Sequence, residues 1–112
     1  MLTLTIIIFA IVALLGLLLL TYILKNKNTP KGVAIIHGSF GALGILLLAI
    51  YICLYSSRPY LSLIIFILAA VGGFIMMFRD ITGRSLPKWL ALGHGSIAVI
   101  GFILLLVFFF MG

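Results

Sequence analysis

The sequence predicts an all-α integral membrane protein, a four-helix bundle built from two tandem helical hairpins. Of its 112 residues, 66% are hydrophobic and only 7% are charged, whereas soluble domains are about 25% charged. Its apolar runs each have about 20 residues, the length of a membrane-spanning helix. They lack the apolar and polar alternation of a membrane β-barrel. Finally, a phrase that contains histidine occurs twice, 57 positions apart.

The chain divides into four apolar runs. The first, Leu2–Leu24, follows no basic segment and ends at no convincing cleavage site, so we interpret it as a retained helix. The second, Val33–Tyr55, follows Pro30, which suits the start of a helix. The third is Tyr60–Phe78, and the tyrosine with which it begins fits the aromatic belt of a membrane interface. The fourth is Trp89–Met111. Because the four runs together fill most of the 112 residues, we expect no soluble domain.

Apart from the charge of Arg58, the net charge of +6 lies in and beside two short loops, which join the first run to the second and the third to the fourth. The basic residues there are Lys25, Lys27, Lys31, Arg79, Arg84 and Lys88. The positive-inside rule therefore predicts that both loops are cytoplasmic and both termini lie outside, and we expect a bacterial inner membrane. Because these charges are not spread over a folded surface, we expect no nucleic-acid binding.

The repeated phrase indicates a duplication. Pro30-Lys31, His37-Gly38-Ser39, Gly41 and Gly44 return as Pro87-Lys88, His94-Gly95-Ser96, Ala98 and Gly101, with no gap in the alignment. We expect one membrane domain, 1–112, with repeat one at 1–55 and repeat two at 58–112. Two hairpins inserted in the same orientation form a parallel repeat, related by an axis along the membrane normal. The two histidines then lie at equal depth, roughly 9 Å inward from the two lysines.

The two histidines are the only ones in the chain, and each has small residues four and seven positions later on the same helix face. Small residues allow close approach of helices, or they let a flat ring lie beside its axial ligand. Imidazole is a common haem ligand, and bundle cores commonly hold cofactors. The predicted haem b site comprises the metal ligands His37 and His94, the small residues Gly41, Gly44, Ala98 and Gly101, and Lys31 and Lys88 beside the propionates. Gly16 and Gly73 would relieve crowding at the ring edge.

The phrases His37-Gly38-Ser39 and His94-Gly95-Ser96, each at the start of a membrane helix, resemble the haem-ligand helices of small membrane cytochromes b, including the cytochrome b561-like group. The resemblance implies a four-helix bundle, bis-histidine haem b and electron transfer with a redox partner or a quinone. The b561 group usually has four ligands and two haems. This chain has two histidines, so at most one bis-histidine haem fits.

Other functions fit the sequence less well. Two histidines fall short of the usual four zinc ligands, and no catalytic constellation is present. A drug exporter of the small multidrug resistance type needs a membrane carboxylate, but the one acidic residue, Asp80, belongs to a basic loop. We therefore expect an electron carrier or subunit rather than a stand-alone enzyme. The open alternative is a haem-free accessory subunit with structural histidines, in a homodimer or a larger membrane complex.

Overall fold

The computed structural model describes residues 1–111, and over this range the chain forms four α-helices and no strand. The helices are α1 (Leu2–Leu24), α2 (Lys31–Leu54), α3 (Tyr60–Ile81) and α4 (Lys88–Met111). This confirms the predicted all-α four-helix class. The first helix has the bounds of its apolar run. The third continues past its apolar run to Ile81, so the charged pair that ends the run is still helical.

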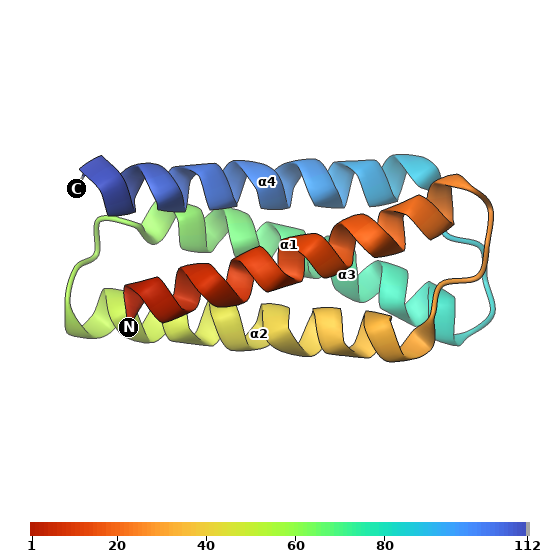
Figure 1. Cartoon of the computed structure of the whole chain (residues 1–112), viewed down its shortest axis with the longest axis horizontal. Helices are drawn as coiled ribbons and strands as arrows, with labels where there is room; N and C mark the ends of the chain where they lie inside the picture. The colour runs from red at the N-terminus through yellow and green to blue at the C-terminus, as the bar shows by residue number, and fades with distance from the viewer. Residues whose placement is uncertain (112) are drawn as a thin grey trace.

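The helices run up and down in an elongated bundle of 42 × 19 × 19 Å (Figure 1). Each hairpin packs within itself, α1 on α2 and α3 on α4, and the hairpins meet through α1 on α4 and α2 on α3. Thus α2 and α4 lie diagonally opposite each other. Both termini lie at one end, here called the terminal end, and loops 25–30 and 82–87 lie at the other, here called the loop end.

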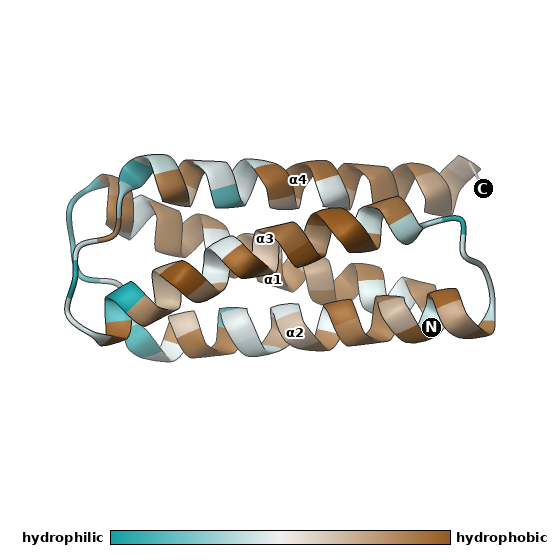
Figure 2. Ribbon diagram, turned by 180° about the vertical axis from the view of Figure 1, so that it is seen from behind, coloured by the Kyte–Doolittle hydropathy of each residue, from teal (hydrophilic) through white to brown (hydrophobic). Residues whose placement is uncertain are grey.

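All four helices over residues 1–111 are long and apolar enough to cross a membrane. Hydrophobic residues make up most of each helix, and polar residues gather in the connecting segments and at the helix ends beside them (Figure 2). The length of the bundle, 42 Å, is close to the total thickness of a bilayer, about 40–45 Å with its headgroups.

A layer of paired residues closes the terminal half of the bundle. The rings of Phe9 and Phe66 stack with centroids 4.0 Å apart and planes inclined by 6°. Gly44 makes room for the first ring, because a Cβ there would lie 2.9 Å from it, and Gly101 makes room for the second, at 3.3 Å. The two phenylalanines are 57 positions apart, and so are the two glycines. Residues at matching places in repeats 1–55 and 58–112 therefore pack at matching places in the bundle.

The two halves of the bundle differ in how tightly they are packed. Among the described helical residues, those classed as buried in the terminal half are Thr5, Ile8, Phe9, Gly44, Leu48, Ser62, Phe66, Ala69, Gly101 and Leu105. In the loop half, Ala91 alone is buried. The part of the bundle that contains the histidines is therefore less tightly closed than the part beneath the two termini.

Candidate cofactor site

The two histidines meet inside the bundle. His37 projects from α2 and His94 from α4, and their ring centroids lie 6.2 Å apart with planes inclined by 80°. The helices α2 and α4 lie diagonally opposite each other in the bundle. Their histidine rings can come so close only if both point towards the bundle axis, between α1 and α3. The structure thus brings together the two residues that the sequence analysis singled out as metal ligands.

A backbone carbonyl holds each imidazole in place. Nδ1 of His37 lies 2.9 Å from the carbonyl oxygen of Val12 on α1. Nδ1 of His94 lies 2.7 Å from the carbonyl oxygen of Ala69 on α3. A carbonyl oxygen only accepts, so Nδ1 must donate its hydrogen, and Nε2 of a neutral ring then carries a lone pair. Histidines that bind metals typically make this second hydrogen bond.

A glycine provides the space in which each ring lies. A Cβ on Gly16 would be 2.9 Å from Cε1 of His37, and a Cβ on Gly73 would be 3.1 Å from Cε1 of His94. Gly16 follows Val12 by four positions, so both lie on one face of α1, one turn apart. The same holds for Gly73 and Ala69 on α3. Each imidazole therefore rests against a helix turn that supplies both an acceptor and a gap.

The small residues after the histidines contact the other helices rather than an open groove. Gly41 faces the side chain of Val12, and a Cβ added to Gly41 would lie 3.8 Å from Cγ1 of Val12. Gly44 faces the ring of Phe9. Gly101 faces Ile65 and Phe66. Gly44 and Gly101 belong to the phenylalanine layer, seven residues or roughly 10 Å along the axis from the histidines. Ala98, at the position that matches Gly41, is half-buried on α4.

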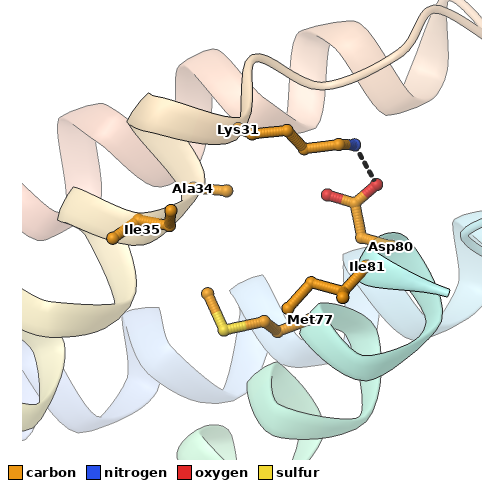
Figure 3. Close-up of a pocket in the computed structure, with 6 residues that line it drawn as sticks. All are labelled: Lys31, Ala34, Ile35, Met77, Asp80 and Ile81. Atoms are coloured by element: carbon orange, nitrogen blue, oxygen red, sulfur yellow. Dashed lines mark hydrogen bonds and ion pairs between the residues drawn. The ribbon is translucent and has the colours of Figure 1, made fainter.

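The two lysines differ in their surroundings. Lys31 forms an ion pair with Asp80 at the end of α3 (Figure 3), and its Nζ donates to Oγ1 of Thr29 over 3.2 Å. Thr29 in turn donates to Asp80 over 2.7 Å, so these three residues tie loop 25–30 to α3. Lys88 is exposed at the start of α4. The residue 57 positions before Asp80 is Ile23, so the second lysine has no carboxylate at the matching place.

Several contacts at the site were not predicted from the sequence. The carbonyls of Val12 and Ala69 carry no side-chain signal, although the two positions are 57 apart and each precedes by one turn a glycine that is repeated. The ion pair of Asp80 was also missed, because the residue was assigned to a loop. Its place in the last turn of α3 directs it towards α2.

The donor set is limited to the two imidazoles. Within residues 1–111, no three side chains of the types His, Cys, Asp and Glu come together as a group that would hold a metal ion. A metal ion that takes four protein ligands therefore has no such set in the described part of the chain. Comparisons of the chain with protein-family models, with curated proteins and with solved structures found no match.

Proposed function

We propose that the protein is a membrane b-type cytochrome, which holds one haem b between His37 and His94 and transfers electrons. The observation that carries this proposal is the fixed orientation of both imidazoles at the bundle centre. Each Nδ1 is taken by a carbonyl of a neighbouring helix, which leaves both Nε2 lone pairs for iron. When bound, haem supplies a reversible one-electron couple.

The donor chemistry fits this cofactor. Bonds from a metal to an imidazole nitrogen are about 2.0 Å long, as for zinc, so two rings with centroids 6.2 Å apart are close enough to share one ion. The loop half of the bundle around them has Ala91 as its single buried helical residue in the described range. Side chains there can repack more readily than in the phenylalanine layer, and this supports a cofactor at and beyond the histidines.

The remaining residues have separate tasks under this proposal. The carbonyls of Val12 and Ala69 hold the ring orientation and make each imidazole a stronger donor to iron. The apolar bundle excludes water, and burial of this kind is one way in which a protein sets a haem potential. Lys88, exposed at the loop end, would stabilise one of the cofactor's carboxylates. Lys31 would stabilise the other only by exchanging its ion pair with Asp80 for it. Gly44 and Gly101 serve the phenylalanine layer, while Gly41 and Ala98 lie one turn from the ligands.

We assign the protein to a bacterial inner membrane, with loops 25–30 and 82–87 in the cytoplasm and both termini outside. Support comes from the four helices of membrane-spanning length within residues 1–111 and from the basic loops at one end. Electrons would pass to or from a quinone or a protein redox partner. A homodimer would cover more helix surface and add a second haem.

The second candidate is a haem-free accessory subunit of a larger membrane complex. It is favoured by one observation: the bonds from His37 to Val12 and from His94 to Ala69 join the two helices of each hairpin. In this case the imidazoles act only as interhelical hydrogen-bond donors, which in membranes contribute about 0.6 kcal/mol on average. The Nε2 atoms of both histidines would then bind no metal ion.

The visible absorption spectrum distinguishes the two candidates. The protein is expressed with ample haem, purified, and recorded before and after dithionite reduction, together with His37→Ala, His94→Ala and, as a neighbouring control, Ser39→Ala. A cytochrome gives a Soret band with split α and β bands on reduction. Either histidine variant loses these bands or becomes high-spin, and the serine variant keeps them. A colourless wild type refutes the proposal.

A further inference from the structure

The loop end carries positive charge that the chain does not neutralise. Six basic side chains lie there or beside it, and the sequence contains one acidic side chain, Asp80. That carboxylate is bound by Lys31 and Thr29. The remaining basic side chains therefore have no acidic side chain in the chain to pair with, and their counter-charge must come from outside the protein.

A polar cavity lies between the two basic loops. Its volume is about 200 Å³, and its wall includes Asn26, Lys27, Asn28, Arg84 and Ser85. Lys27 and Arg84 supply two positive charges, and the one carboxylate in the wall, Asp80, is paired with Lys31. The two amides and Ser85 add hydrogen-bond donors, so the wall has the chemistry that recognises a phosphate group. One wall is held by a bond in which Nε of Arg79 donates to the carbonyl oxygen of Ser85 over 3.0 Å.

An apolar cavity adjoins the polar one, on the side of the helices. It has a volume of about 260 Å³ and lies between α2 and α3, with Ala34, Ile35, Met77 and Ile81 in its wall (Figure 3). Asp80 lines both cavities, so the two cavities meet at this carboxylate, which also forms the ion pair with Lys31. Polar space thus lies beside the loops, and apolar space lies beside the hydrophobic bodies of the helices.

We propose that these two cavities together bind one anionic phospholipid, with its phosphate between Lys27 and Arg84 and an acyl chain against Ala34 and Met77. The order of the cavities matches the order of phosphate and acyl chain in a lipid at a membrane interface. Basic pockets between membrane helices on the cytoplasmic side commonly bind acidic headgroups. This inference rests on insertion of the bundle in a bilayer and is independent of haem.

The proposal predicts one such site per chain. The matching corner between α4 and α1 has Leu20 and Ile23 where the site has Met77 and Asp80. Without a carboxylate at that position, no ion pair with Lys88 can separate polar from apolar space. The duplication therefore gives two similar hairpins but a single lipid corner.

Native mass spectrometry of the detergent-solubilised protein tests the proposal. The protein is mixed with equal amounts of phosphatidylglycerol and phosphatidylcholine, and bound lipid is measured. We expect one phosphatidylglycerol per chain in preference to phosphatidylcholine. The double variant Lys27→Gln/Arg84→Gln should lower the preference about 25-fold, since each basic residue near an acidic lipid surface contributes a factor of about five. Both side chains are exposed, so the variant should fold.

The control is Lys25→Gln, which removes one charge from the same end but outside the cavity and should keep the preference. The matching cavity variant, Lys27→Gln, should lower the preference about fivefold. A further variant, Ala34→Leu, narrows the apolar cavity and should weaken phosphatidylglycerol binding. Equal loss in the control and the cavity variant would show diffuse attraction and overturn the proposal. It is also overturned if inorganic phosphate displaces the lipid while Ala34→Leu has no effect, because the site would then bind a free anion.

Discussion

Replacement of Gly16 by alanine is the sharpest test of how His37 is held. The added Cβ would lie 2.9 Å from Cε1 of the ring, whereas carbon atoms in contact prefer about 3.5–4.0 Å. The ring must therefore move away from α1 by about 0.6 Å or more. The carbonyl oxygen of Val12, which accepts the hydrogen bond from Nδ1 of His37 over 2.9 Å, lies on the same face of α1. The shift would lengthen this bond to about 3.5 Å, beyond the usual range of hydrogen bonds.

The expected cost follows from these terms. Loss of the interhelical hydrogen bond costs about 0.6 kcal/mol in a membrane, and overpacking costs about 1–3 kcal/mol. The better helix propensity of alanine returns about 1 kcal/mol. We expect Gly16→Ala to lower the free energy of unfolding by about 1–3 kcal/mol. Gly73→Ala should cost less, since its contact with His94 is 3.1 Å.

The matched control is Gly93→Ala, because a Cβ built there meets nothing within 4 Å. This substitution should be neutral or stabilising by up to about 1 kcal/mol. Unfolding by sodium dodecyl sulfate in mixed micelles, followed by circular dichroism, measures all three variants. Nitrogen NMR of the imidazoles reports the Nδ1 hydrogen bond directly. If Gly16→Ala and Gly93→Ala are equally stable, His37 does not lie against α1 and our description of the site is wrong.

Three further predictions concern the core, the ion pair and the topology. Phe9→Ala should lower the free energy of unfolding by about 3–4 kcal/mol, whereas Phe74→Ala, on a side chain that is 76% exposed, should have little effect; similar losses would refute the phenylalanine layer. Asp80→Asn should cost less than about 1 kcal/mol, and a salt titration should show that the difference from wild type shrinks with ionic strength; a difference that does not shrink would contradict an ion pair. In a cysteine-free background, an impermeant maleimide should label Ser57→Cys in intact cells but not Lys27→Cys, and the reverse pattern would invert the proposed topology.

Much of the fold could be predicted because helices of membrane-spanning length are recognisable in a sequence from the length and hydropathy of its apolar runs. The four apolar runs gave four helices within the described residues, and the charged loops separated them. The end of α3 was less predictable. The hydropathy of Arg79 and Asp80 suggested a loop, but their backbone stays helical, because the backbone hydrogen bonds of a helix do not depend on whether the side chains are apolar.

The candidate site was predictable in its side chains and not in its backbone. The repeat singled out His37 and His94, and the structure brings these residues together. The repeat could not indicate that the ring of Phe9 packs against Gly44. A small residue leaves space equally well for a cofactor or for a neighbouring side chain. Backbone acceptors such as the Val12 carbonyl are the same in every residue, so their role emerges only when the helices are placed.

The haem content of the purified protein, combined with electron paramagnetic resonance of its oxidised form, decides whether His37 and His94 bind haem. The haem is quantified as its pyridine complex against protein concentration. For a cytochrome we expect one haem b per chain, with the low-spin ferric signal of two imidazole ligands, and loss of that signal in His94→Ala. Absence of haem from protein expressed with ample supply, or a signal that survives the loss of His94, would contradict the proposal.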